Sequence, residues 1–331
     1  MQNLMVDNFD RQISYMRVSI TDRCNLRCTY CMPAWGYEWM DKDKVLTYDE
    51  ILRLVSVAAK RGLYKVRVTG GEPLVRDGVV DFVSGLHHTP GIREIAMTTN
   101  AVLRKKYAEP LKKAGLQRIN ISLDSLDPKK FEEVTRGHVF WKVWEGIEDA
   151  ERVGFDPVKI NVVLQKGVND DECVDFAKMT FEKPYHIRFI EYMPAGDYED
   201  WKAKYMPFSE IKERITKELG ELHPIVRMDA DGPAKNFKFE DARGVLGFIT
   251  AISDNHFCDK CNRVRLTADG RIRPCLFSEI AVDFREPLRR NCEDEEIHDL
   301  FDQVLGIKPQ AHELAKLSEE KMLKAMVDIG G

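Results

Sequence analysis

Short apolar runs alternate with helical patterns over residues 14–191. This alternation strongly limits the folds that the chain can adopt. Between the runs, apolar residues recur at helical spacing, and Thr47 with Glu50 forms a capping-box pattern at the first expected helix. Parallel strands joined by helical crossovers produce such an alternation. The expected strands cover residues 15–20, 65–68, 94–98, 118–123, 158–164 and 186–190.

A closed eight-fold barrel would need two more units of this kind. We therefore predict an α/β fold, a partial (β/α)6 TIM-like barrel with a C-terminal α+β extension that closes the barrel mouth. After Pro194 the pattern changes to one helix, over 209–219, then short β-like pieces and a charged helical tail. No Gly/Ser-rich linker separates the two parts, so we expect them to pack together. The predicted division is a barrel of residues 1–225 and a C-terminal region of residues 226–331.

The composition excludes several classes of partner. The 331 residues carry 50 Lys and Arg against 55 Asp and Glu, a net charge of −5. This balance argues against nucleic acid or an anionic membrane as the partner. The sequence has no apolar run of about 18 residues and no basic start followed by an apolar core. We expect a cytoplasmic protein.

Three basic residues, Arg67, Lys159 and Arg188, stand in the middle of expected strands. The outer face of such a strand lies under helices, so these side chains should point into the barrel. A hydrocarbon interior does not accept three unpaired cations, which predicts a bound anion there. The alternative is that each cation pairs with a barrel carboxylate such as Asp124 or Glu191.

Cys24, Cys28 and Cys31 follow the first expected strand with the spacing C-x3-C-x2-C. Three thiolates on one loop can ligate three irons of a cubane cluster and leave the fourth iron open. A structural zinc site takes four ligands, and no fourth residue stands at an obvious spacing. Buried structural thiols or a zinc loop remain the alternatives.

A second group of cysteines lies near the C-terminus, at Cys258, Cys261 and Cys275. This group could also hold a cluster with one open iron, or zinc with the neighbouring His256 as a fourth ligand. Arg263 and Arg265 follow on one face of the next expected strand. Their planar guanidinium groups suit phosphate oxygens, which favours a cluster beside a phosphate site over zinc.

The first cysteine loop, with Tyr30 before its last cysteine, resembles that of the radical S-adenosylmethionine superfamily. Thr69-Gly70-Gly71-Glu72-Pro73, after the second expected strand, is similar to the superfamily's Gly-Gly-Glu-Pro loop, which receives the amino group of S-adenosylmethionine. Glycines let backbone approach a ligand, and Glu72 offers a carboxylate to an ammonium group. Ser122 matches a superfamily position near the carboxylate of the cofactor.

Over nearly its whole length the chain resembles the GTP 3′,8-cyclase family of molybdenum-cofactor biosynthesis. In that family the double glycine at the chain end reaches into the active site. Ala101 is a departure, because the family usually has glycine there and alanine tolerates a positive φ poorly, so we expect a local difference. Residues 326–329 are also less typical. The matching segments are Asp22 to Pro33, Arg67 to Arg76, Ile121 to Leu126, Phe257 to Phe277 and Gly330-Gly331.

The resemblance implies a lyase that cyclises GTP to (8S)-3′,8-cyclo-7,8-dihydroguanosine 5′-triphosphate, the first step of molybdenum-cofactor biosynthesis. A 5′-deoxyadenosyl radical from S-adenosylmethionine would remove the ribose 3′-hydrogen. The implied cofactors are S-adenosylmethionine and two 4Fe–4S clusters, one on each group of cysteines. The second cluster would hold the guanine through its open iron.

The resemblance also implies roles for single residues. The catalytic residues would be the three N-terminal cysteines with Arg263 and Arg265. Contacts to S-adenosylmethionine would come from Tyr30, Gly70, Gly71, Glu72, Ser122 and Met193. Contacts to GTP would come from Arg17, Arg67, Thr98, Lys159, Arg188, Arg263 and Arg265.

The implied partners are GTP, a reducing electron-donor protein and the downstream cyclic pyranopterin monophosphate synthase, and a homodimer is compatible with the pattern. The main alternative is another radical S-adenosylmethionine enzyme with an auxiliary cluster, acting on a peptide. Such an enzyme would not need Arg263, Arg265 or the double glycine. A zinc-binding scaffold or an RNA-associated protein is a further alternative, and the acidic balance argues against the RNA-associated protein.

Overall fold

The computed structural model describes residues 4–32, 37–103, 106–193, 201–225, 232–312 and 326–329. Its strands form one sheet with the order β12-β11-β10-β1-β2-β3-β4-β5-β6-β9-β8-β7. The strands are β1 (Tyr15–Ser19), β2 (Lys65–Thr69), β3 (Glu94–Thr99), β4 (Arg118–Ser122), β5 (Lys159–Leu164), β6 (His186–Glu191), β7 (His223–Pro224), β8 (Lys235–Lys238), β9 (Val245–Ile249), β10 (Arg263–Leu266), β11 (Arg271–Arg273) and β12 (Val282–Asp283). The α-helices are α1 (Tyr48–Lys60), α2 (Val79–His88), α3 (Ala108–Lys113), α4 (Pro128–Thr135), α5 (Phe140–Arg152), α6 (Cys173–Glu182), α7 (Trp201–Lys204), α8 (Phe208–Leu219), α9 (Arg285–Arg289) and α10 (Asp294–Gly306).

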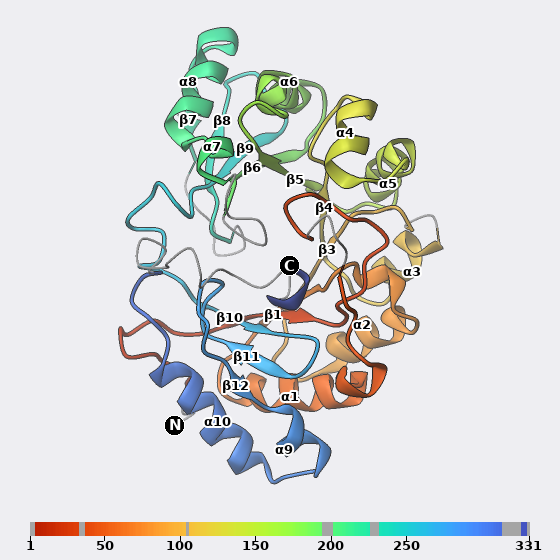
Figure 1. The fold of residues 1–331 in the computed structure, drawn as a ribbon, viewed down its shortest axis with the longest axis vertical. Helices are drawn as coiled ribbons and strands as arrows, with labels where there is room; N and C mark the ends of the chain where they lie inside the picture. Colours follow the sequence, from red (N-terminus) through yellow and green to blue (C-terminus); the bar gives the residue numbers. More distant parts are fainter. Residues whose placement is uncertain are drawn as a thin grey trace.

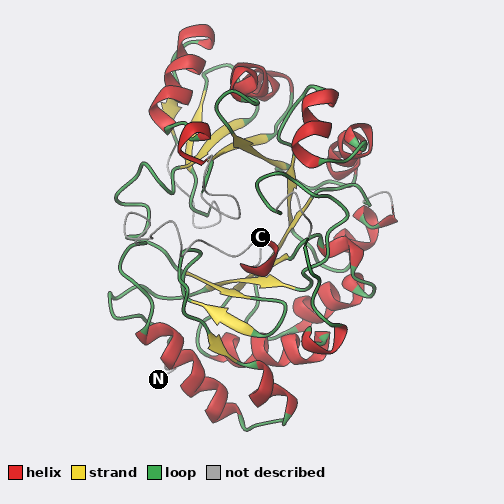
Figure 2. Cartoon of the chain, in the orientation of Figure 1, coloured by secondary structure: helices red, strands yellow, loops and turns green. Residues whose placement is uncertain are grey.

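The predicted partial barrel is confirmed. Strands β1 to β6 lie side by side in chain order and run parallel. The strands surround the middle of the molecule and the helices lie outside them (Figures 1 and 2). The C-terminal region lengthens the parallel part, because β10 pairs with β1 and β9 pairs with β6. In the part of the chain that the structure describes, β9 and β10 do not pair with each other, so the barrel stays open between them.

Alternate side chains of the barrel strands face opposite sides of the sheet. Met16, Val18, Val66 and Val68 face outward and belong to one hydrophobic core that the strands share with the surrounding helices. The residues between them face inward and are largely polar. This division follows the sequence pattern and leaves a polar interior for a ligand.

Local sequence signals explain where the helices begin. In the capping box before α1, the Glu50 backbone N–H donates to Thr47 Oγ1 at 3.2 Å and the Thr47 N–H donates to Glu50 Oε2 at 2.6 Å. The sequence pattern predicts a helix over 103–114, but α3 covers only Ala108–Lys113. Pro110 explains the difference, because proline is accepted in the first turn of a helix and not in its interior.

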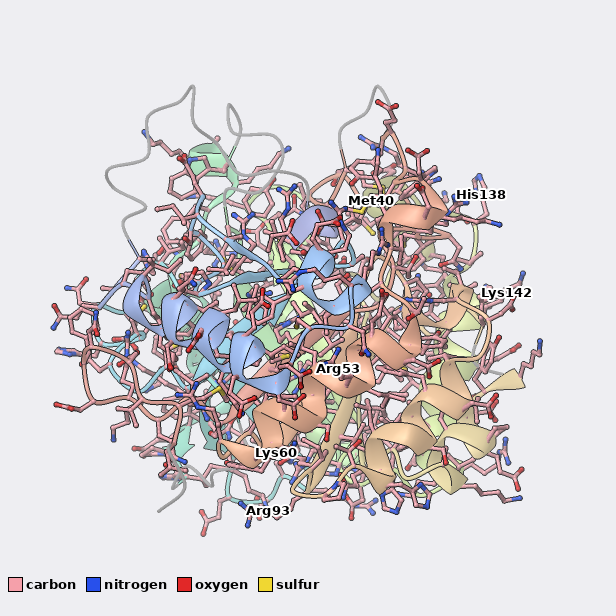
Figure 3. All side chains as sticks on the ribbon, turned by 90° about the horizontal axis from the view of Figure 1, so that it is seen from below. Met40, Arg53, Lys60, Arg93, His138 and Lys142 are labelled. Carbon is pink, nitrogen blue, oxygen red and sulfur yellow. The ribbon has the colours of Figure 1, made fainter. Side chains whose placement is uncertain are left out.

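The C-terminal region packs against the barrel, as expected. Its last long helix, α10, lies beside α1: Lys60 and Arg53 of α1 both reach Asp294, at 2.7 and 3.6 Å (Figure 3). The predicted boundary at residue 225 falls beside residues 226–231, which lie outside the described part, and it stays a prediction. Among the described residues, the helices are all too short or too polar to cross a lipid bilayer.

Candidate active site

A large cavity lies inside the barrel, at the end where the loops follow the parallel strands. Ligands of parallel α/β sheets bind at this end. The cavity encloses about 1460 Å³ of space between atoms, including the open space at its mouth. The C-terminal region completes its wall with Pro233, Ile249, Leu276, Met326 and Val327.

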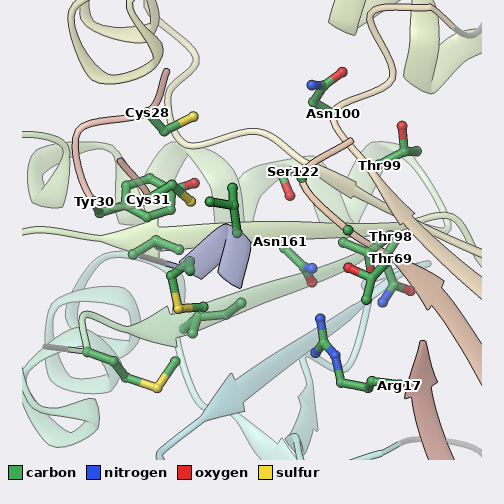
Figure 4. Close-up of a pocket in the computed structure, with 18 of the residues that line it drawn as sticks. Arg17, Cys28, Tyr30, Cys31, Thr69, Thr98, Thr99, Asn100, Ser122 and Asn161 are labelled. Carbon is green, nitrogen blue, oxygen red and sulfur yellow. The ribbon is translucent and has the colours of Figure 1, made fainter. Parts of the chain in front are cut away.

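Most of the predicted site residues meet in this cavity. Figure 4 shows Cys28, Tyr30 and Cys31 on one side, Arg17 and Thr98 across from them, and Ser122 with Asn161 between. Lys159 and the second group of cysteines do not line the cavity. The predicted residues that do line it are Arg17, Cys24, Cys28, Tyr30, Cys31, Arg67, Gly70, Gly71, Glu72, Thr98, Ser122, Arg188, Met193, Arg263 and Arg265.

The first cysteine loop follows β1 and packs on the end of α4. The N–H groups of Arg27 and Thr29 donate to Thr135 O at 3.1 Å and Val134 O at 2.9 Å. Burial raises the pKa of the Cys24 thiol to about 11 and raises the pKa values of Cys28 and Cys31 as well. Three half-buried thiols that share one cavity therefore need a positively charged partner before they can ionise together.

This donor set fits an iron–sulfur cluster. A cluster binds thiolates, its irons supply the missing positive charge, and three cysteines leave one iron for another ligand. Among the described residues, no group of three or more His, Cys, Asp or Glu side chains is placed to hold a single metal ion. Within the described part of the chain, the zinc-loop alternative for this group therefore gains no support.

The Gly70-Gly71 pair has a packing role in addition to the cofactor contact that the resemblance implies. A Cβ atom on Gly71 would lie 2.4 Å from Arg23 O, and one on Gly70 would lie 2.6 Å from Thr21 O. The Gly71 N–H also donates to Thr21 O at 2.7 Å. The two glycines therefore let the loop after β2 pack directly on the backbone that leads into Cys24.

Glu72 lies next to this contact and is 1% exposed. Its carboxylate accepts from the Thr99 hydroxyl at 2.7 Å, from Asn100 N–H at 2.7 Å and from Leu74 N–H at 3.0 Å. Burial raises the pKa of Glu72 to about 7, although these three donors lower it. A cationic ligand group in the cavity would restore the charged form, as the predicted ammonium contact requires.

Tyr30 connects the cysteine loop to the next strands. Its hydroxyl donates to Asp124 Oδ2 at 2.7 Å, and the other oxygen of Asp124 accepts from Val163 N–H at 2.9 Å. Asp124 follows β4, two residues after Ser122, and both line the cavity. This chain of contacts fixes the ring of Tyr30 beside Cys28 and Cys31.

A row of arginines crosses three neighbouring strands on the opposite wall. Arg17 of β1 lies level with Arg67 of β2 on one side and with Arg265 of β10 on the other. Neighbouring strands are about 4.8 Å apart, and like charges at this spacing repel. Burial, followed by the charges of Arg265, Arg67 and Arg263, lowers the pKa of Arg17 well below its usual value. The row therefore favours a polyanion.

Two other cations of the barrel contact neutral side chains. Arg188 Nη2 donates to Asn161 Oδ1 at 2.7 Å, and Arg67 donates to the hydroxyl of Tyr15. Asp124 accepts from the donors described above. Glu191 accepts from Ile252 N–H at 2.8 Å, Ser253 N–H at 3.0 Å and the Ser253 hydroxyl. Lys159 is 3% exposed, at the level of Asn120 and His186.

The second group of cysteines lies beside the arginine wall. Cys261 and Arg263 both line a neighbouring cavity, and Arg263 also lines the central one. Although burial raises it, the Arg263 guanidinium and the Lys308 ammonium lower the pKa of Cys261 to about 6. Cys261 and Cys275 lie close enough for their charges to raise the pKa of Cys258, which burial raises first. Three thiols faced by cations fit a cluster.

His256 does not complete a zinc site with these cysteines. Its side chain is 85% exposed, and its Nδ1 lies 2.8 Å from Asp259 Oδ2.

Several cavity residues were missed by the sequence reasoning. Tyr15, Asn120 and Asn161 line the cavity together with Arg17, Ser122 and Arg188. Each missed residue lies two positions from a predicted one on the same strand. The period of two along a strand was the available signal.

The C-terminal end of the chain reaches the cavity. A short 3-10 helix, η8 (Met326–Ile329), lies within the ring of strands (Figure 1). The Met326 N–H donates to Cys31 O at 3.2 Å, and Met326 and Val327 line the cavity. Gly330-Gly331, which the resemblance places in the active site, lies outside the described residues.

The departure at Ala101 does not change the backbone in the way expected. Ala101 adopts φ +59° and is fully buried, so the loop keeps the left-handed conformation that glycine would take. The Ala101 N–H donates to Thr99 Oγ1 at 3.0 Å. Alanine therefore bears a local strain here, and the loop that holds Glu72 keeps its form.

Comparisons with known proteins agree with this geometry. Residues 18–180 match the radical SAM superfamily, and residues 185–314 match the family described as Molybdenum Cofactor Synthesis C. A protein of Thermodesulfovibrio yellowstonii named GTP 3′,8-cyclase is 48% identical over 329 residues, which covers 99% of this chain and all of that protein. The protein of the same name from Petrotoga mobilis is 47% identical over 328 residues, with the same coverage.

Solved structures show the same fold at low sequence identity. Streptococcus suis SuiB bound to S-adenosylmethionine aligns with a TM-score of 0.66 and 16% identity, over 97% of this chain and 78% of that one. At this identity the likeness concerns the fold alone.

Proposed function

Because this chain belongs to the GTP 3′,8-cyclase family of the radical SAM superfamily, we propose that its cavity binds GTP beside S-adenosylmethionine and cyclises GTP. The product would be (8S)-3′,8-cyclo-7,8-dihydroguanosine 5′-triphosphate, in the first step of molybdenum-cofactor biosynthesis. The row formed by Arg265, Arg17 and Arg67 is the observation that carries this proposal.

On the cofactor side, Cys24, Cys28 and Cys31 would hold an iron–sulfur cluster, and the loops around them would hold S-adenosylmethionine. The chemistry supplied by these groups when bound is one-electron cleavage that yields a radical able to remove a ribose hydrogen. Glu72 would receive the amino group, since its carboxylate has acceptor capacity left beside its three donors. Tyr30, Gly70, Gly71, Ser122 and Met193 would complete the binding site.

On the substrate side, the arginine row would bind the triphosphate. Guanidinium groups donate two parallel hydrogen bonds to phosphate and stay charged, so a polyanion relieves the repulsion along the row. Arg263, Thr98 and Arg188 would add contacts from the same wall. Lys159 would act less directly, because it is buried and does not line the cavity, although its neighbour in the sheet, Asn120, does.

We place a second 4Fe–4S cluster on Cys258, Cys261 and Cys275. Its support is that Cys261 and Cys275 lie near Cys258, that Arg263 and Lys308 face Cys261, and that Arg263 also lines the central cavity. When bound there, the cluster would supply an iron with a free coordination position for the guanine base of GTP. The first cysteine group and Arg263 with Arg265 would then be the catalytic residues.

The predictions about partners, location and domain division stay predictions. They comprise a reducing electron-donor protein, a downstream cyclic pyranopterin monophosphate synthase, a homodimer, a cytoplasmic location and the boundary at residue 225. The peptide-modifying alternative gains no support from the cavity, because a peptide does not need three level arginines.

The test is anaerobic reconstitution with iron and sulfide, followed by mass spectrometry of a mixture with GTP, S-adenosylmethionine and dithionite. Cys24→Ser should abolish both S-adenosylmethionine cleavage and cyclisation. Cys258→Ser should keep the cleavage and lose the cyclised product. Cys292→Ala, which removes a buried cysteine outside both groups, is the matched control. This variant should retain both S-adenosylmethionine cleavage and GTP cyclisation. Normal cyclisation by Cys258→Ser would rule out the second cluster.

A further inference from the structure

Lys308 lies just after α10 and is 3% exposed. A buried ammonium needs partners for its charge and for its three donors. Among the described residues no carboxylate forms an ion pair with it, so its charge is balanced in another way. The contacts of Lys308 all lead to the second cysteine group.

Three contacts define the surroundings of this ammonium. Lys308 Nζ donates to Arg263 O at 2.9 Å and to Pro274 O at 2.7 Å, and it lies 3.7 Å from Cys261 Sγ. Arg263 is two residues after Cys261, and Pro274 immediately precedes Cys275. The ammonium therefore joins the two loops that carry these cysteines and faces one of the sulfur atoms.

The residues after Lys308 continue along the same cysteines. The His312 backbone N–H forms a hydrogen bond with the Cys258 thiol, and His312 Nε2 lies 2.6 Å from Ala251 O. From the other side, Arg11 Nη1 donates to Cys258 O at 2.9 Å and to Gln310 O at 2.7 Å. Arg11 also holds Pro309 O and is itself paired with Asp7 at 2.7 Å. The segment 308–312 is thus clamped onto the cysteine group.

We propose that Lys308 is a positioning residue for the second cluster, holding the Cys261 and Cys275 loops together and balancing the charge of the Cys261 thiolate. This proposal rests on the second cluster of the proposed function. Hydrogen bonds and charges next to the sulfur atoms set how tightly a cluster is held and at what potential it is reduced. A clamp that served only the fold would change neither property.

The test uses the full chain with Cys24, Cys28 and Cys31 all changed to serine, so that any cluster bound sits on the second group. After anaerobic reconstitution, iron and sulfide content, loss of iron to a chelator and the midpoint potential are measured. Lys308→Met in this background should lose iron at least about tenfold faster. Its remaining cluster should have a more negative potential, because a positive charge beside it favours reduction.

Two further variants separate this role from a structural one. Lys308→Arg keeps the charge and donors and should retain the cluster close to the parent rate. Arg61→Met removes contacts of Arg61 to His298 O and Asp302, within α10, and should leave both cluster readouts unchanged.

If Lys308→Met loses iron at the same rate as Arg61→Met and its cluster has the same potential, the proposed role of Lys308 is wrong. If the triple serine background holds no iron at all, the second cluster itself is absent and the Lys308 proposal ends with it. Retention of iron by the background, with loss on Lys308→Met, supports both.

Discussion

Replacing Arg265 by methionine should make the free protein more stable and its binding of GTP weaker. Arg265 is level with Arg17, which is level with Arg67, so three guanidinium groups stand on adjacent strands. Methionine keeps most of the apolar length of the side chain and removes the charge. A gain in stability together with a loss of binding is expected for an anion site. Removal of one partner of a structural ion pair would instead lower the stability.

The size of the stability effect follows from the surroundings of Arg265. Burial, followed by the charge of Arg263, lowers its pKa to about 10 from the usual 12.5. One pKa unit corresponds to about 1.4 kcal/mol, so the charged form carries a penalty of about 3 kcal/mol in the free protein. Part of this penalty remains in the variant, because Arg17 and Arg67 still repel each other. We expect a gain of about 1–3 kcal/mol and a rise in melting temperature of roughly 2–5 °C.

The size of the binding effect follows from the bond that is lost. A hydrogen bond to a charged group contributes about 1.5–3 kcal/mol, so GTP should bind between about tenfold and about 150-fold more weakly. Anaerobic calorimetry measures the affinity, and thermal unfolding with and without GTP measures the stability. Arg271→Met is the matched control, since Arg271 lies on the adjacent strand, is 46% exposed and pairs with Asp269. A variant that is less stable than the parent and binds GTP normally would refute the reasoning.

Two further predictions concern the loops around the first cysteine group. Burial raises the pKa of Glu72 to about 7, so the carboxyl is protonated at acidic pH and S-adenosylmethionine should bind more weakly as pH falls below about 7. The same shift affects stability: the contribution of protonated Glu72 is lost as pH rises from the ordinary pKa of 4.5 through about 7. Glu72→Gln should flatten both pH profiles. Calorimetry measures the binding profile, and denaturation measures the stability profile. Ala101→Gly should relieve about 1 kcal/mol of left-handed strain and lose about 0.8 kcal/mol of methyl burial, for a net change under about 1 kcal/mol. Urea denaturation checks this balance, and a loss well above 1 kcal/mol would contradict it.

Much of the fold could be predicted because local patterns determine it. The alternation from Tyr15 to Glu191 specifies parallel strands with helices outside, and a mid-strand cation such as Arg67 must then point inward. The cysteine spacing identifies the first group, because ligands on one short loop are close together in any fold, and it identifies the Cys258–Cys261 pair of the second group for the same reason. These signals need no knowledge of contacts between distant segments.

The rest depends on contacts that no local pattern contains. That Arg265 lies level with Arg17 follows from the pairing of β10 with β1, strands about 250 residues apart in the chain. The tight packing of Gly71 on Arg23 O depends on how two loops meet, and so does the burial of Lys308. Lys159 is buried and does not line the cavity, although its neighbour in the sheet, Asn120, does, and the position of Lys159 within its strand does not reveal this difference.

The pairing of β10 with β1 connects the second cysteine group to the arginine row in the central cavity. The N–H groups of Ser14 and Tyr15 both donate to Asn262 O, at 3.1 and 3.2 Å, directly after Cys261. A slip of β10 by one residue would turn Arg263 and Arg265 to the outer face, into the hydrophobic core, and bring Val264 into the cavity. The same slip would move Cys261 relative to Lys308. The register of one strand pair therefore sets the positions of the arginine row and of the second cysteine group together.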